Sequence, residues 1–327
     1  MRTAGSPSHT AWDAVPPQAS HPDEGGPLRR LRRRIMRLAP RPLVRALARP
    51  YVAGETRREA IDVVRRLQAD HGLMSTIDVL GEAIHDERES RATLEEYVAI
   101  LDDLAACRYA NISIKLSALG QALDEDLCAR QLETLLEHAR RHDQFVRLDM
   151  EDHTTTDSTL THYRRLCGRY PRLGIVLQAR LHRTPRDVEE LAPLRPNVRL
   201  CIGIYREPVQ ISLQDKPAMK TRLLELLETM WHNGQYVAIA THDEAVIGRA
   251  LQLAERMGKT PADFEVQMLL GVPRAAIQRR LREQGVKVRL YVPYGSNWYH
   301  YCLRRLDNSP EMARMVLANL LRRGGRG

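Results

Sequence analysis

Three side chains near the carboxyl end of the chain have the chemistry to bind a small carboxylate. Residues 289–307 read as an alternating apolar strand, a Pro/Gly turn and a helix that carries Tyr301, Arg304 and Arg305. Residues three or four positions apart on a helix are neighbours, so the phenol and the two guanidinium groups can face one pocket. A guanidinium pair matches a carboxylate bidentately, and a tyrosine supplies a flat wall with a polar edge. The adjacent arginines could instead form a solvated helix face.

Further polar side chains stand at or just beyond the ends of short apolar runs. They are Lys115, Asp149, Gln178, Arg199, Tyr205, His242, Gln267 and Tyr291. A buried lysine or aspartate is costly unless an opposite charge accompanies it, so Lys115 and Asp149 require a functional role or an ion pair. His242 could instead cap the following helix, and each tyrosine alone could be a packing residue. Their shared position at the same end of successive runs favours one common site.

The elements that must position these side chains repeat along the chain. Eight short apolar runs occur at residues 75–80, 111–116, 145–150, 174–178, 198–204, 236–240, 264–269 and 286–292. Between them lie amphipathic segments such as 94–106, 129–139, 218–230 and 273–284, which predict crossover helices. Eight such units in about 270 residues are typical of an α/β protein of the (β/α)8 barrel type, whose sites assemble at the carboxyl ends of the strands. The main alternative, a doubly wound open sheet, normally shows a GxGxxG run that this sequence lacks.

The positive charge of the chain is concentrated in one segment. The formal charge is +9 and the pI about 9.5, and residues 27–50 contain nine arginines and no acidic residue. We expect residues 1–26 to be a disordered tail, residues 27–50 a basic helical arm and residues 51–327 the catalytic barrel. The arm could bind an anionic membrane surface, act as a solubilising segment or pack on the barrel. No nucleic-acid recognition motif accompanies the charge, so specific nucleic-acid binding is not expected.

The five cysteines lack the CxxC spacing of a zinc site and any paired disulfide framework. They are Cys107, Cys128, Cys167, Cys201 and Cys302, and their scatter indicates reduced thiols in a cytoplasmic protein. No apolar run approaches the roughly 20 residues of a membrane span, and the first residues lack the apolar core of a signal peptide. The sequence also shows no ligand set for a metal. We expect a cytoplasmic protein, with peripheral membrane contact through the arm as the alternative.

Eight motifs occur in a fixed order from residue 51 onward. They are YVAGET (51–56), SIKLSALG (113–120), RLDMED (147–152), VLQARLHRT (176–184), RLCIGIYREP (199–208), ATHDE (240–244), EVQMLLGV (265–272) and the pair RLYVPYG (289–295) and YHYCLRRL (299–306). With these motifs the chain resembles the proline dehydrogenase family, particularly its monofunctional bacterial enzymes. The resemblance implies a barrel that binds FAD, oxidises L-proline or a close cyclic imino acid to Δ1-pyrroline-5-carboxylate, and passes electrons to a quinone.

The resemblance also implies roles for individual residues. The catalytic residues would be Lys115, Asp149, Tyr205 and Tyr291. The substrate would be held by Lys115, Leu269, Tyr291, Tyr301, Arg304 and Arg305. FAD would be bound, or its site ordered, by Asp149, Gln178, Arg199, Cys201, Gly203, Thr241 and His242, with Arg199 beside the reactive nitrogen of the flavin.

Two departures from the family pattern bear on the substrate. Ile204 stands where the family usually has alanine, and Asn308 where it usually has an acid. A branched side chain at position 204 is expected to narrow the space for the substrate ring. Three function classes therefore stay open: a flavin oxidoreductase acting on proline or on another cyclic amine of specialised metabolism, a non-redox barrel enzyme that uses Lys115 as a Schiff-base amine, and a catalytically impaired binding protein.

Overall fold

The structure is a computed structural model that describes residues 50–81, 84–299 and 301–302. The tail and nearly all of the basic arm expected over residues 1–50 lie outside the described residues, as do Arg304, Arg305 and Asn308. The carboxylate site predicted from the two arginines, and the domain boundaries at residues 26 and 50, therefore stay predictions.

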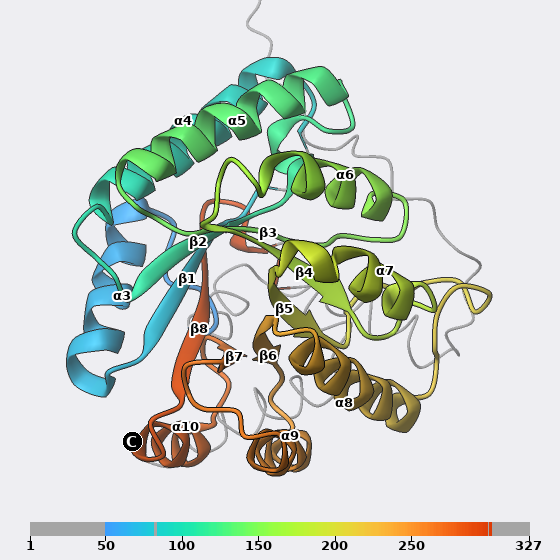
Figure 1. The fold of residues 1–327 in the computed structure, drawn as a ribbon. Helices are drawn as coiled ribbons and strands as arrows, with labels where there is room; N and C mark the ends of the chain where they lie inside the picture. Colours follow the sequence, from blue (N-terminus) through green and yellow to red (C-terminus); the bar gives the residue numbers. More distant parts are fainter. Residues whose placement is uncertain (1–49, 82–83, 300, 303–327) are drawn as a thin grey trace, which may run out of the picture. The chain divides into compact units, whose positions relative to one another are not determined.

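Eight parallel strands form a closed barrel in which each strand pairs with the next and β8 pairs with β1 (Figure 1). The strands are β1 (Met74–Val79), β2 (Ala110–Ile114), β3 (Val146–Leu148), β4 (Leu173–Gln178), β5 (Asn197–Cys201), β6 (Tyr236–Ala240), β7 (Phe264–Leu269) and β8 (Lys287–Tyr294). The predicted (β/α)8 barrel and its eight strands are confirmed. The largest difference in bounds is at β5, predicted to reach Ile204, which ends at Cys201 before Gly203 takes a φ of 101°.

Helices surround the barrel, as Figure 1 shows. They are α3 (Arg57–His71), α4 (Glu87–Asp103), α5 (Glu125–Arg141), α6 (Thr156–Leu166), α7 (Thr184–Leu191), α8 (Lys216–His232), α9 (Glu244–Arg256) and α10 (Ala275–Glu283). Aspartate side chains accept backbone N–H bonds at the N-termini of α4, α5, α8 and α9, through Asp86, Asp124, Asp215 and Asp243. Each such cap typically contributes about 1 kcal/mol. The cap at Asp243 starts α9 directly after His242, which fixes the short loop that carries this predicted site residue.

Alternation along the strands gives the barrel an apolar outer face and a polar interior. Ile112, Ile114, Val198 and Ile239 are fully buried, in the core cluster that the strands form with the helices. Side chains of the opposite parity form hydrogen bonds across the barrel, and they include Ser113, Asp149, Arg199, Glu265, Gln267, Arg289 and Tyr291. Successive side chains of a strand point to opposite faces, so a mainly apolar strand can still line the interior with charged groups.

A buried charge cluster occupies the part of the interior nearer the amino ends of the strands. Glu265 accepts hydrogen bonds from Arg289 Nε at 2.8 Å and Nη2 at 3.2 Å. Arg147 donates to the carbonyl oxygens of Ile175 and Asn197, both at 3.0 Å. Burial lowers the pKa of Arg147 to about 9, and the charge of Arg199 acts in the same direction. Arg147 thus joins β3 to β4 and β5, and Arg289 joins β8 to Glu265 of β7 and to the Ser75 carbonyl oxygen of β1.

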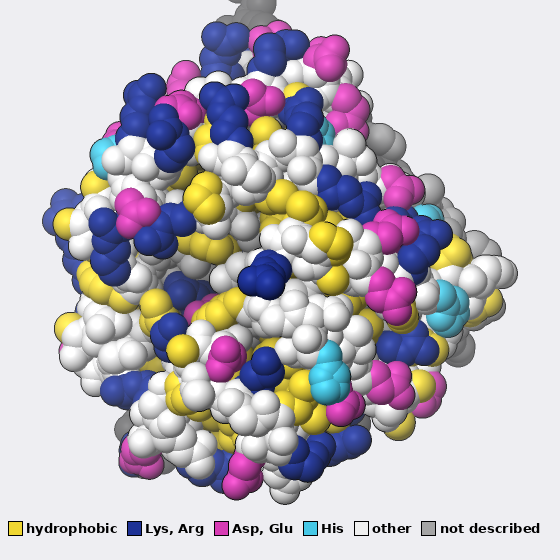
Figure 2. Space-filling view, in the orientation of Figure 1, with side chains coloured by type: hydrophobic (Ala, Val, Ile, Leu, Met, Phe, Trp, Pro, Cys, Tyr) yellow, Lys and Arg dark blue, Asp and Glu magenta, His cyan; other side chains and the backbone are white. Residues whose placement is uncertain are grey.

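Charged residues on the outer surface are interspersed by sign. On the face drawn in Figure 2, lysine and arginine side chains alternate with aspartate and glutamate. Several form exposed ion pairs, such as Arg164 with Glu190 at 2.7 Å and Arg140 with Glu137 at 2.6 Å. Exposed pairs of this kind contribute little to stability, because water and salt screen their charges.

Gly174 on β4 makes room for the buried guanidinium group of Arg147. A Cβ atom at this position would lie 2.5 Å from Phe145 Cζ, 2.8 Å from the carbonyl oxygen of Asn197 and 2.9 Å from Arg147 Nη1. We expect Gly174→Ala to lower the free energy of unfolding by about 1–3 kcal/mol, the usual penalty of overpacking a core. Urea unfolding measures the change. Gly248→Ala is the control, because nothing lies within 4 Å of its added Cβ, and an equal loss in both variants would contradict the explanation.

Candidate active site

Asp149, directly after β3, is the centre of a hydrogen-bond network at the carboxyl ends of the strands. It accepts from Ser113 Oγ at 2.5 Å, Arg199 Nη1 at 2.6 Å and Tyr291 Oη at 2.7 Å. Burial by itself would raise the pKa of Asp149, but the charges of Arg199 and Lys115 and the two hydroxyl donors outweigh it, so the pKa lies below its ordinary value. The network therefore holds a carboxylate anion that joins β2, β3, β5 and β8.

The side chain of Arg199 on β5 is 6% exposed and contacts Gln267 and Tyr291 in addition to Asp149. Its Nε donates to Gln267 Oε1 at 2.5 Å, and its guanidinium carbon lies 5.2 Å from the ring centroid of Tyr291. Its Nη2 is buried and has no hydrogen-bond partner within the described residues. Because a buried donor without a partner is costly, this nitrogen is suited to bind a group that the protein itself does not supply.

Lys115 is paired with Asp78, a residue that the sequence analysis did not select. Lys115 Nζ lies 2.9 Å from Asp78 Oδ1, and Asp78 is 1% exposed. Tyr97 of α4 supports the same region, since its hydroxyl donates to the carbonyl oxygen of Ser113 at 2.8 Å. A single acid inside the apolar run STIDVL is the signal that could have identified Asp78. The opposite charge explains how Lys115 can be buried at the end of a barrel strand.

Tyr291 is a hydroxyl donor throughout the physiological range. Burial raises its pKa well above the ordinary value, and the nearby Asp149 and Asp78 carboxylates add to the effect. The proton therefore stays on the phenol that faces Asp149, and the position of the ring is fixed by this bond.

Gly203 allows a close approach beside Gln178. Its φ of 101° favours glycine, and a Cβ atom there would collide with Gln178 Oε1 and lie 2.9 Å from Arg180 Cδ. Gln178 Nε2 donates to the carbonyl oxygen of Glu151 at 2.7 Å, whereas its Oε1 is buried without a partner among the described residues. Cys201 packs nearby, and burial raises the pKa of its thiol to about 11, so it stays protonated.

His242 connects the ends of β6 and β7. Its Nε2 accepts from the backbone N–H of Leu269 at 2.8 Å, which places the proton of the neutral ring on Nδ1. Thr241 Oγ1 accepts from the backbone N–H of Asp243 at 3.1 Å, and Arg274 Nε donates to the His242 carbonyl oxygen at 3.0 Å. These contacts orient the imidazole at the strand ends.

Two predicted site residues, Tyr205 and Tyr301, lie outside these direct contacts, and Leu269, the last residue of β7, joins them only through its backbone N–H. Tyr205 is in the loop after β5, where its carbonyl oxygen accepts from Arg180. Tyr301 packs against an apolar cluster of Val52, Leu80 and Cys302. Ile204 is 69% exposed, so the expected narrowing of a ring pocket stays a prediction.

The residues fit a flavin. The isoalloxazine ring offers both carbonyl acceptors and an N–H donor, which match the unpartnered Arg199 Nη2 and Gln178 Oε1. Gly203 leaves open the space beside that amide oxygen. Asp149, Arg199, Gln178, Gly203 and His242 thus come together at one end of the barrel as the sequence analysis expected, but their roles toward a cofactor stay predictions.

The chain matches one protein family and several individual proteins of known function. The family model described as proline dehydrogenase matches residues 60–204 and 213–314, and Tyr205 falls in the interval between the matched segments. Proline dehydrogenase 1 of Bacillus subtilis is 35% identical over 277 residues, covering 84% of this chain and 91% of its own length. Proline dehydrogenase of Deinococcus radiodurans is 35% identical over 307 residues, covering 89% of this chain and 98% of its own.

Solved structures show the same fold in longer proteins. Proline utilization A from Bdellovibrio bacteriovorus, inactivated by N-propargylglycine, aligns with 87% of this chain at a TM-score of 0.76 and 23% identity. Proline utilization A from Corynebacterium freiburgense aligns with 89% of it at a TM-score of 0.69 and 19% identity. This chain spans 35% and 33% of those two proteins.

Proposed function

Because the chain belongs to the proline dehydrogenase family of flavin-dependent oxidoreductases, we propose that it oxidises L-proline to Δ1-pyrroline-5-carboxylate, with FAD as cofactor and a quinone as acceptor. The observation that supports this most is the Asp149–Arg199–Tyr291 network, which presents, at the strand ends, a guanidinium nitrogen that has no hydrogen-bond partner among the described residues. Enzymes of this fold carry their catalytic residues there.

The substrate is a small zwitterion, and the roles of the side chains follow from its charges. The proline carboxylate would be bound by Lys115, Arg304 and Arg305, because an anionic group entering a dry site requires cations. Tyr291 would pack beside the ring and hold its hydroxyl on Asp149. A bound flavin would supply the two-electron acceptor for oxidation of the C–N bond. The fixed positive charge of Arg199 would stabilise the negative charge that the flavin acquires as it accepts the electrons of the substrate.

The absorption spectrum of the purified protein tests the proposal. A yellow, flavin-loaded protein that bleaches on anaerobic addition of L-proline would support both the cofactor and the substrate. A protein that takes up no flavin on reconstitution would exclude it. Retained flavin without bleaching by any cyclic imino acid would instead support the catalytically impaired binding protein.

A different cyclic amine is the second candidate substrate. Ile204 and Asn308 depart from the family pattern at positions expected to surround the ring and the second arginine. Comparing initial bleaching rates among proline, its four- and six-membered ring homologues and hydroxyproline discriminates between these substrates, since a hydrophobic pocket distinguishes one methylene by roughly 10- to 200-fold.

We also propose that the arginine-rich residues 27–50 bring the enzyme to an anionic membrane surface, where a quinone acceptor is dissolved. No helix within the part of the chain that the structure describes has the length and apolarity to cross a bilayer. Sedimentation of the full chain with anionic but not with neutral vesicles would support this attraction.

Arg305→Met is expected to weaken binding of a carboxylate inhibitor such as tetrahydrofuroic acid by about 2 kcal/mol, roughly 30-fold, because it removes one partner of a desolvated charge pair. FAD stays bound in the variant. Titration of the flavin spectrum with the inhibitor measures the change. Arg280→Met on the exposed face of α10 is the control, and equal inhibitor affinities in both variants would show that position 305 does not contact the carboxylate.

A further inference from the structure

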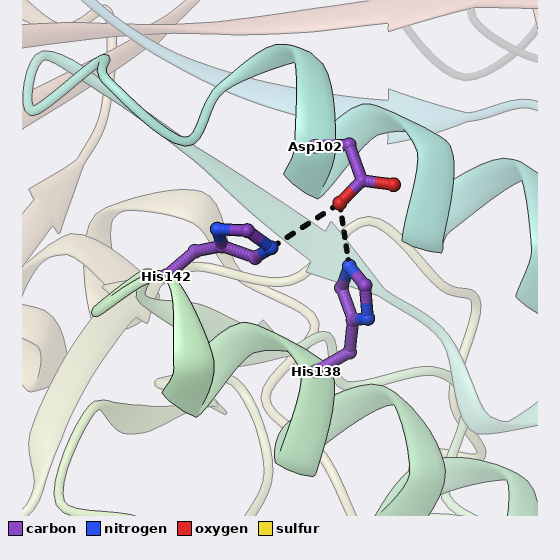
Figure 3. Close-up of side chains that lie close together, drawn as sticks. All are labelled: Asp102, His138 and His142. Carbon is purple, nitrogen blue, oxygen red and sulfur yellow. Dashed lines mark hydrogen bonds and ion pairs between the residues drawn. The ribbon is translucent and has the colours of Figure 1, made fainter.

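Two histidines and one aspartate converge on the outside of the barrel, where α4 and α5 end. Asp102 lies in the last turn of α4, His138 lies in the last turn of α5, and His142 is the C-cap residue of α5. Figure 3 shows both imidazole rings directed at one carboxylate oxygen. Asp102 Oδ1 is 2.8 Å from His138 Nε2 and 3.2 Å from His142 Nε2.

The spacing of these three atoms suits a metal ion. All three lie within 4.8 Å of one another. Zinc binds histidine nitrogen and carboxylate oxygen at about 2.0–2.2 Å, which places neighbouring ligand atoms roughly 3 Å apart. The two nitrogen–oxygen separations, 2.8 and 3.2 Å, are already close to this value. The two histidine nitrogens lie within 4.8 Å of each other, so theirs is the separation that metal binding has to adjust.

The backbone holds the three side chains in place before any ion binds. His138 and His142 are four residues apart, so they share one face of α5. Gln131 Nε2 of α5 donates to Ser90 Oγ of α4 at 2.5 Å. Near the triad, the Gln144 amide donates to the carbonyl oxygens of Leu104 and Cys107, the latter at 3.3 Å. The Gln131 bond joins the middle of α5 to the first turn of α4, whereas the Gln144 bonds tie the segment after α5 to the segment after α4 and so restrain the separation of the histidines from Asp102.

The local charge also favours a cation. The carboxyl ends of two helices meet here, and each carries a partial negative charge that stabilises positive ions. The arginines nearby have acidic partners of their own, since Arg108 binds Asp143 at 2.9 Å and Arg140 binds Glu137 at 2.6 Å. With exposed fractions of 22% and 31%, the side chains of His138 and His142 remain accessible to an ion from solvent.

We propose that Asp102, His138 and His142 bind a divalent cation of the zinc class and join the ends of α4 and α5. Imidazole and carboxylate ligands suit zinc, cobalt, nickel and copper, and water would complete the coordination. Each ring would bind the ion through the lone pair of its Nε2 atom, with the ring proton on Nδ1. The site lies at the end of the barrel where α4 and α5 lead into β2 and β3, whereas Asp149 lies at the opposite end. Residues at the amino ends of barrel strands contribute to stability, so we assign this role to the metal site.

Calorimetric titration of the full-length, flavin-loaded, tag-free chain with Zn²⁺ tests the proposal. We expect one zinc ion per chain and an apparent Tm that rises by roughly 5 °C at a zinc concentration a hundred times the Kd. D102N and H138Q should each weaken the affinity by at least about 100-fold, because even outer-shell partners of a ligand matter 10- to 100-fold. Cobalt in place of zinc should give visible absorption bands that both variants lose.

Two controls separate this site from other zinc-binding groups. H232Q removes an exposed histidine from the last turn of α8 and should leave the titration unchanged. Proline-dependent bleaching by D102N and H138Q verifies that both variants are folded. If the proposed activity fails, far-ultraviolet circular dichroism spectra and zinc-free melting temperatures equal to those of the parent serve the same purpose. No zinc uptake by the parent chain, or equal affinity in the parent, D102N and H138Q, would overturn the proposal.

Discussion

Arg199→Met is expected to lower the rate at which L-proline bleaches the bound flavin by about 10²- to 10³-fold, the loss usual when one preorganised donor is removed from an active site. Arg199 is fixed by Asp149 at 2.6 Å and Gln267 at 2.5 Å, so its charge is positioned before any ligand binds. Methionine replaces the aliphatic stem of arginine but supplies neither the charge nor the Nη2 atom that has no partner among the described residues. Anaerobic stopped-flow measurement at saturating proline gives the rate.

A second variant separates catalysis from stability. Arg199→Met leaves the Asp149 carboxylate buried without its closest cation, which typically costs about 3–5 kcal/mol of unfolding free energy. Adding Asp149→Asn removes the uncompensated charge, so the double variant should recover much of this stability. The bleaching rate should stay low. If the rate recovered together with stability, the proposed roles of Arg199 at the flavin and of Asp149 in catalysis would both be wrong.

The fold was predictable because the outer face of the barrel must be apolar at every strand. Runs such as residues 236–240 and 264–269 coincide with β6 and β7, since their apolar residues pack under helices and their bounds coincide with polar turns. The predicted end of a strand was less accurate where an apolar run continues into the following loop. Residues 202–204 extend the run of β5, yet the left-handed φ of Gly203 ends the strand.

The site was predictable to the extent that it depends on parallel strands ending at one face. Asp149, Arg199 and Tyr291 follow from that rule, and the structure joins them by direct bonds. Tyr97 could not be found in this way, because its contact with Ser113 depends on how α4 packs against β2. Asp78 is marked in the sequence as the single acid of an apolar run, but its pairing with Lys115 depends on how β1 and β2 lie side by side in the closed barrel.

The metal-binding triad shows the same limit. His138 and His142 have the four-residue spacing of helical ligands, a signal in the sequence that our expectation of no metal-ligand set did not take into account. Asp102 comes from a different helix, 36 residues before His138, and only the packing of α4 on α5 brings its carboxylate to the two rings. Spacing along the chain identifies ligands within one element, whereas ligands from two elements require the tertiary structure.

The acid side of the stability profile should depend on Glu265. Arg289 and Gln267 hold the pKa of this buried carboxyl at about 2, against the opposing effect of burial, compared with an ordinary value of 4.5. As the pH falls, the unfolded chain therefore takes up the proton first. The contribution of Glu265, roughly 3 kcal/mol, is complete above about pH 4.5 and is lost progressively toward pH 2.

Glu265→Gln is therefore expected to lower the free energy of unfolding at pH 7 by about 3–5 kcal/mol, because Arg289 and Arg147 remain buried without their carboxylate. Between pH 4.5 and 3 the stability of the parent should fall more steeply than that of the variant, by up to about 1.4 kcal/mol per pH unit. Urea unfolding at fixed pH values measures both effects. Glu137→Gln, which removes only an exposed partner of Arg140, should leave the profile nearly unchanged. Parallel pH profiles for the parent and Glu265→Gln would show that the pKa of this carboxyl is the same in the folded and unfolded chains, and that the arginines in the interior do not stabilise its charge.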